Sequence, residues 1–285
     1  MKFKKEFKLK IAELSANNKT NDLITLIKNY ISDNYTTFIN SCDRPNTNAY
    51  HLNKFLNWLV SGENLPFKVF IKDGNKKLPF LCFSTLPAVT CPGAGECLKW
   101  CYSYKAWRYP ASFLRQVQNT ILMYNFSIIR NELIKIVNLP KFKKMNKIDF
   151  RLYVDGDFKT ENEIKEWMKL LKEIPKINAY GYSKSLQFFK RLKENNFKFP
   201  LNYVLNLSNG GKFDFLHDEL NKYSFVRGNF EALNIKNKTA KEIKKTYPNK
   251  KIFICPLLCG SCTKLGHACG NLTVFKDYSI LINKH

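Results

Sequence analysis

The feature that most restricts the fold of this chain is a series of strand–loop–helix units after residue 147. Apolar, strand-like runs lie at 148–154, 176–182 and 201–207, and helical patterns lie at 160–171, 185–194 and 214–222. Shorter strand candidates follow at 225–227 and 251–255. Strands that alternate with helices through short turns are typical of a parallel α/β sheet. The sequence therefore predicts an α/β fold, either open or shaped as a partial (β/α) barrel.

Polar residues and glycines follow the ends of these predicted strands, as Asp155-Gly156-Asp157, Ser183 and Ser208-Asn209-Gly210. In α/β folds the carboxyl edge of the sheet is where sites are built, so a small-molecule ligand is expected there. Paired carboxylates can bind a metal or an amine, or act as acid and base, which makes Asp155 and Asp157 the candidate catalytic residues. The alternative is an Asx-type turn that caps the next helix.

A loop with three cysteines, Cys91, Cys97 and Cys101, precedes this series. Gly93 and Gly95 make its turn tight and leave backbone N–H groups free to face a sulfur or an anion. An apolar run at 78–86 leads into the loop, and a long helical pattern follows from about residue 111. Three thiolates at a strand-to-helix turn predict a metal or iron–sulfur site. Buried, inert cysteines are the alternative.

A second group of four cysteines lies near the C-terminus, at Cys255, Cys259, Cys262 and Cys269. Four thiolates within fifteen residues fit a Cys₄ zinc site or a cubane cluster. His267 could replace one of them, or Cys255 could be only the end of a buried strand. The two groups could also share ligands, because the strand order brings both to one edge.

The cysteine content and the hydropathy of the chain indicate in which cellular compartment it resides. The nine cysteines argue for reduced thiols, because seven of them cluster as metal ligation requires. No apolar run is long enough to span a bilayer, and the lysine-rich start lacks a signal-type apolar segment. A cytoplasmic protein without membrane association is expected.

The chain is expected to divide into three parts. Residues 1–62 form a helical N-terminal extension, in which Phe3, Phe7 and Ile11 recur at helical spacing. Residues 63–250 form the α/β part, which begins with strands at 67–72 and 78–86 around a turn at 73–75. Residues 251–285 form a Cys-rich, metal-binding segment.

The charge of the chain points to a polyanionic partner. Lys and Arg total 47 against 23 Asp and Glu, which gives a net charge of +24. Such a field attracts nucleic acid. A hydrophobic fraction of 45% excludes a disordered chain.

Several segments resemble the "gene product 88"-like proteins of phages and plasmids, a family without a described activity. The resemblance covers roughly residues 80–285. It is carried by Cys91-Pro-Gly-Ala-Gly-Glu-Cys97-x-x-x-Cys101-Tyr102, the strand at 151–158, the Trp167 helix, Tyr180-Gly-Tyr-Ser-Lys184 and the C-terminal cysteines. It implies a protein of mobile genetic elements.

More distantly, the order of elements is similar to that of radical S-adenosylmethionine enzymes. That resemblance implies a partial (β/α) barrel with Cys91, Cys97 and Cys101 around a [4Fe–4S] cluster, whose open iron takes S-adenosylmethionine. It also implies an auxiliary cluster on the C-terminal cysteines. The cofactor-binding residues would be Trp100, Tyr102, Gly156, Asp157, Ser183 and Ser208. The spacing here is Cys-x₅-Cys-x₃-Cys, where that superfamily usually has Cys-x₃-Cys-x₂-Cys.

Two functions follow from the sequence. The first is an iron–sulfur protein with a radical-S-adenosylmethionine-like barrel, in which Asp157 and Gly156 face a small molecule. The second is a nucleic-acid-binding protein of mobile-element replication or host takeover, with zinc or a cluster on its cysteines and no S-adenosylmethionine chemistry. A metal-assisted nuclease that uses Asp155 and Asp157 is a weaker third hypothesis.

Overall fold

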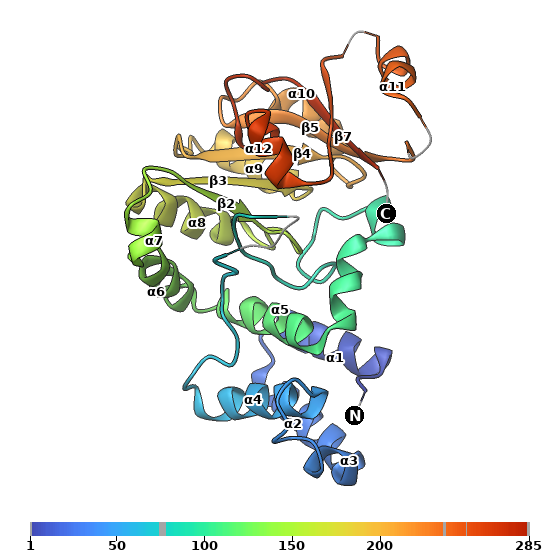
Figure 1. Cartoon of the computed structure of the whole chain (residues 1–285), viewed down its shortest axis with the longest axis vertical. Coiled ribbons are helices and arrows are strands. Elements are labelled where there is room, and N and C mark those ends of the chain that lie inside the picture. The colour runs from blue at the N-terminus through green and yellow to red at the C-terminus, as the bar shows by residue number, and fades with distance from the viewer. Residues whose placement is uncertain (1, 74–77, 236–237, 249, 284–285) are drawn as a thin grey trace.

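The computed structural model describes residues 2–73, 78–235, 238–248 and 250–283. Its centre is a seven-stranded sheet of order β1-β2-β3-β4-β5-β7-β6, in which every neighbouring pair is parallel (Figure 1). The strands are β1 (Leu81–Cys82), β2 (Ile148–Leu152), β3 (Ile177–Ser183), β4 (Tyr203–Ser208), β5 (Val226–Leu233), β6 (Ile252–Ile254) and β7 (Ser279–Asn283). The prediction of an α/β fold with a parallel sheet is confirmed. Within the described ranges no ladder joins the edge strands β1 and β6, so the sheet is open.

The connections between successive strands are helical. They are α5 (Pro110–Leu122), α6 (Phe126–Val137), α7 (Pro140–Lys143), α8 (Glu161–Glu173), α9 (Leu186–Glu194), η3 (Asp214–Leu216), α10 (His217–Leu220) and α11 (Ala240–Thr246). Two joined helices, α5 and α6, replace the long pattern that began near residue 111. Thr160 caps α8 by accepting the N–H of Glu163. The Glu163 carboxylate accepts from the N–H of Lys159, the residue before the Thr160 cap.

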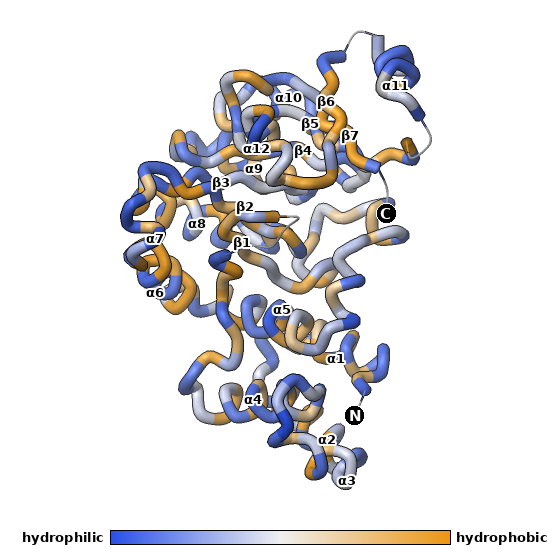
Figure 2. The backbone as a smooth tube through the Cα atoms, viewed as in Figure 1, coloured by the Kyte–Doolittle hydropathy of each residue, from blue (hydrophilic) through white to orange (hydrophobic). Residues whose placement is uncertain are grey.

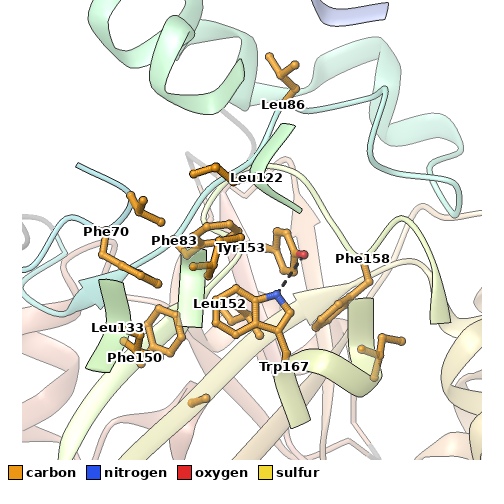
Figure 3. Close-up of a cluster of buried hydrophobic side chains, with 14 of the residues drawn as sticks. Phe70, Phe83, Leu86, Leu122, Leu133, Phe150, Leu152, Tyr153, Phe158 and Trp167 are labelled. Atoms are coloured by element: carbon orange, nitrogen blue, oxygen red, sulfur yellow. Dashed lines mark hydrogen bonds between the residues drawn. The ribbon is translucent and has the colours of Figure 1, made fainter. Parts of the chain in front are cut away.

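The two faces of the sheet differ because side chains alternate along each strand. On β2, Ile148, Phe150 and Leu152 face the main hydrophobic core, in which Trp167 of α8 is fully buried (Figure 3). The Trp167 indole N–H lies 3.3 Å from the Tyr153 hydroxyl, which it contacts as donor. The other face of β2 carries polar side chains and is covered by the C-terminal segment.

The N-terminal helices pack as a layer on α5, on the side away from the sheet (Figure 1). They are α1 (Lys5–Ala16), α2 (Thr20–Asp33), α3 (Tyr35–Ile39) and α4 (Asn48–Ser61). Their apolar side chains, such as Ile11, Leu23 and Phe55, belong to the same buried cluster as the core of the sheet. The predicted helical extension is confirmed as helical and shares its core with the α/β part. In the hydropathy view the tube alternates between the two extremes along these helices, as an amphipathic layer requires (Figure 2).

The structure differs from the predicted arrangement in the strands before the cysteine loop and in several elements that the sequence did not predict. The strands at 67–72 and 78–86 shrink to β1 and a single antiparallel bridge between Ile71 and Cys82, and residues 74–77 of their turn lie outside the described residues. Beyond β1, Phe83 and Thr85 still donate backbone hydrogen bonds to Arg151 and Asp155. The sequence did not predict α11, α12 (Cys259–Lys264) or β7. β7 lies between β5 and β6, so the C-terminal segment completes the sheet.

None of the helices in the described part of the chain is both long and apolar enough to cross a membrane.

Candidate metal-binding and ligand-binding cavity

One cavity of about 480 Å³ lies at the carboxyl edge of the sheet. All seven clustered cysteines line it: Cys91, Cys97, Cys101, Cys255, Cys259, Cys262 and Cys269. The two groups are separated by more than 150 residues of sequence, and the parallel topology brings them together. The expectation that both groups reach one edge agrees with this arrangement.

The three-cysteine loop is fixed to the loop that follows β4. Ala94 and Gly211 form an antiparallel bridge, and the N–H of Cys97 donates to the carbonyl of Gly210. A Cβ on Gly93 would lie 1.8 Å from the carbonyl oxygen of Lys184, so no other residue fits this approach. The first cysteine group is therefore held by backbone contacts from two neighbouring strand ends.

Asp214 shapes the loop on which the cysteines rest. Its carboxylate accepts the N–H of Gly210 at 2.7 Å and the N–H of Gly211 at 2.9 Å. Gly210 has a φ of +86°, a conformation that glycine adopts without strain. Asp214 thus acts on the three-cysteine loop indirectly, through the backbone of residues 210 and 211.

Asp157 is buried, and the protein satisfies its carboxylate completely. Its Oδ1 accepts from the N–H of Phe158 at 2.8 Å and the hydroxyl of Ser183 at 2.7 Å. Its Oδ2 accepts from the N–H groups of Lys184 at 2.8 Å and Ser185 at 3.2 Å. A carboxylate has about four lone-pair sites, so none remains for a ligand. This geometry favours the Asx-turn interpretation, in which Asp157 ties the end of β2 to the end of β3.

Asp155 is the carboxylate that keeps capacity for a ligand. It lines the cavity, and its Oδ2 accepts from the Gln116 side chain at 3.0 Å. Burial raises the pKa of Asp155, although hydrogen bonding to Ser103 and the charge of Arg151 act against the shift. The backbone between the two carboxylates turns at Gly156, which has a φ of +81° and where a Cβ would lie 2.1 Å from the Thr85 hydroxyl oxygen.

The remaining predicted cofactor-binding residues divide into two sets. Trp100, Tyr102 and Ser208 line the cavity together with Gly156. Ser183 is buried and holds Asp157 instead. The Tyr102 hydroxyl donates to the carbonyl of Val154 at 2.8 Å, and the Lys184 ammonium donates to the Ser208 hydroxyl.

Burial raises the pKa of several of the clustered thiols, which favours their protonated form in the absence of a cation. Burial raises the pKa of Cys91, and the nearby carboxylate of Asp157 adds to the shift. Burial also raises the pKa of Cys269 to about 12, against a hydrogen bond from Tyr182 and the positive charge of Arg227. A bound metal would displace these protons, so binding would release protons and strengthen with pH.

The cysteines share one cavity but do not form a finished ligand set. Within the described residues no three His, Cys, Asp or Glu side chains are grouped as the ligands of a single ion. The seven thiols therefore line a common volume without the geometry of a metal or cluster site.

Several residues that line the cavity were not predicted from the sequence as ligand-binding residues. Arg151, Tyr180 and Tyr182 line the cavity between the two cysteine groups, with the Arg151 guanidinium 4.9 Å from the centre of the Tyr182 ring. His267 and Lys184 line it as well. The available signal was the alternation along β2 and β3, which places these polar side chains at every second position.

Comparisons with known proteins give one match. Residues 58–259 match the family described as Gene product 88, from within α4 to the first cysteine of α12. The match begins earlier than the resemblance noted in the sequence and leaves Cys262 and Cys269 outside it. No curated protein and no solved structure matches the chain. Because the match spans more than half of the chain, this protein belongs to the Gene product 88 family.

Proposed function

We propose that the chain is an iron–sulfur protein that binds a small molecule at the carboxyl edge of its sheet. The observation that carries the proposal is the shared cavity, which both cysteine groups line together with Asp155. Buried cysteines that serve only packing need not converge. Their convergence on one volume is what ligation of a cluster requires.

The loop cysteines Cys91, Cys97 and Cys101 would hold a [4Fe–4S] cluster, and the C-terminal cysteines would hold a second centre. The cluster supplies one-electron chemistry when bound. Three protein thiolates leave one iron for an outside ligand. Trp100 belongs to this loop and lines the same cavity.

The finer form of the proposal is a radical-S-adenosylmethionine-like enzyme with a partial barrel. In this form Gly156 and Ser208 border the bound S-adenosylmethionine, and Asp155 pairs with its amino group. Asp155 takes this role in place of Asp157, whose lone pairs are already used. A cationic amine beside Asp155 would oppose the desolvation that raises its pKa and keep it ionised.

The test of the cluster assignment uses serine variants of each cysteine group in the full chain. Replacing Cys91, Cys97 and Cys101 together should remove about four irons per chain and leave the rest. If the triple variant retains all its iron, the loop is not a cluster site. For the finer form, the reduced protein is incubated with S-adenosylmethionine, and absence of 5′-deoxyadenosine would leave an iron–sulfur protein without this chemistry.

A second candidate function is nucleic-acid binding, with zinc on the cysteines. The observation that favours it is the net charge of +24, together with the exposed lysines Lys2, Lys4, Lys5 and Lys10 along α1. Binding to DNA or RNA should then weaken steeply as salt increases, because each neutralised phosphate releases counterions. Absence of binding at low salt would reject this function.

A further inference from the structure

His267 is the one histidine among the described residues that lines the cavity, and the sequence offered it only as an alternative to one of the cysteines. It lies between Cys262 and Cys269 in the sequence, where its backbone N–H donates to the carbonyl of Cys262 at 3.0 Å. The residue is 8% exposed. A buried imidazole needs hydrogen-bond partners or a metal, because desolvation of its ring nitrogens is costly.

The two ring nitrogens have different surroundings. Both ring nitrogens are buried without a hydrogen bond in the described protein. Nδ1 nevertheless lies 3.3 Å from Oδ2 of Asp149, within reach of that carboxylate. A Nδ1–H directed at Asp149 would leave the lone pair of the neutral ring on Nε2. The imidazole therefore presents an unused donor atom.

Neighbouring residues fix the ring in this orientation. The ring stacks on Phe80 at 4.7 Å and meets the edge of Tyr180 at 4.6 Å, both measured between ring centres. A Cβ on Gly270 would lie 2.8 Å from Cε1 of His267, so only glycine allows this packing. His267 itself has a φ of +54°, which is unusual for a residue with a side chain and is typical of strained functional positions.

A second layer of hydrogen bonds supports Asp149. Its Oδ1 accepts from the Asn178 amide at 2.9 Å, and the same amide reaches the carbonyl of Gly270 at 3.4 Å. An oriented carboxylate behind one nitrogen of a histidine is the arrangement that positions the other nitrogen on a metal.

We propose that His267 is a metal ligand of the C-terminal cysteine group, bound through Nε2 and positioned by Asp149. The ligand class is a transition metal with mixed thiolate and imidazole coordination, either iron in a cluster or zinc. Cys259, Cys262 and Cys269 lie in the same short segment and line the same cavity. This inference rests on the proposed function only in requiring that the C-terminal group binds metal.

The test compares metal content and spectra of the full chain purified without oxygen. His267→Ala should lose the C-terminal centre and keep the loop centre, whereas His267→Cys should retain both. Asp149→Asn should weaken the C-terminal centre by about 10–100-fold in metal affinity, because an amide has one oxygen, which cannot accept from Asn178 and from Nδ1 in the positions that the two carboxylate oxygens hold. Asp149→Asn keeps one oxygen that can accept from Asn178. It therefore provides a second test of the proposal if His267→Ala does not fold.

The matched control is His217→Ala. His217 is also buried, with Nε2 3.7 Å from Oδ1 of Asp214 and without a hydrogen-bond partner, but it does not line the cavity. With ¹⁵N-histidine in an iron-loaded protein, pulsed electron paramagnetic resonance should detect a strongly coupled nitrogen that His267→Ala removes and His217→Ala preserves. In a zinc-loaded protein, cobalt substitution reports the same difference as a shift of the visible bands.

Equal metal content and an unchanged spectrum in His267→Ala and Asp149→Asn would overturn the role of His267 and leave the cysteine sites standing. A wild-type chain without any bound metal would overturn this inference and the proposed function together. A wild-type chain in which only the loop cysteines bind metal would overturn this inference alone.

Discussion

At the scale of single residues, Asp155 and Asp157 show how position decides the role of the same side chain. Both follow β2, and burial raises the pKa of both. Asp157 is held by three backbone N–H groups and one hydroxyl, so it serves the turn. The sequence could place the pair at the strand end, but it could not show which carboxylate the next strand would engage, because that depends on the register of β2 and β3.

Glu163 gives a pH-dependent prediction at this scale. Burial raises its pKa from 4.5 to about 7 in the folded chain. Between these two pH values the folded state holds a proton that the unfolded state has lost, so stability decreases as pH rises through the window. Glu163→Gln should remove about 3 kcal/mol of this decrease, measured as the free energy of unfolding from pH 4.5 to pH 8. A variant whose stability declines as steeply as the wild type would contradict the raised pKa.

At the scale of elements, the sequence predicted β2, β3 and β4 well, because buried parallel strands form continuous apolar runs. It missed β7, since a five-residue run far from a helix gives little periodic signal. It missed α12 because two of its residues are cysteines, which were interpreted only as ligands. The hairpin before the cysteine loop was overestimated, because β1 is an edge strand whose pairing depends on tertiary contacts.

The close approach of the three-cysteine loop to Lys184 predicts that substitutions of two glycines differ in their effect on stability and iron content. Gly93→Ala should destabilise the protein by about 1–3 kcal/mol and lower its iron content, because the new methyl group meets the backbone of Lys184. Gly260→Ala, inside α12, should be tolerated, since the nearest atom to a new Cβ is 3.8 Å away. The measurements are thermal unfolding and iron per chain. Equal behaviour of the two variants would show that the loop does not need its close approach.

At the scale of the whole molecule, the N-terminal helices and the sheet form one continuous core. Helical periodicity predicted the helices themselves, but no local pattern could predict that they would pack on α5, because that surface is created by residues 50 or more positions away. The cavity is likewise a product of topology. The cysteines and His267 could be identified as candidates in the sequence, whereas Arg151 and the tyrosines between the two cysteine groups became recognisable only in three dimensions.

Because the N-terminal helices share one core with the sheet, a substitution in these helices should lower the stability of the whole protein. Phe55→Ala, in α4, should cost about 3–5 kcal/mol, because Phe55 is fully buried in the common cluster. Unfolding should remain a single transition by both circular dichroism and tryptophan fluorescence. Val60→Ala on the exposed side of α4 is the control and should change stability by less than about 0.5 kcal/mol. Two separate transitions in the Phe55 variant would contradict a common core.

The most direct test of the iron–sulfur assignment is the absorption spectrum of the protein purified without oxygen, with iron and acid-labile sulfide counted per chain. We predict a brown protein whose charge-transfer absorption bleaches on reduction, with iron and sulfide in equal amounts. A colourless protein that contains zinc and no sulfide would contradict the central claim and would leave the nucleic-acid-binding function as the better account.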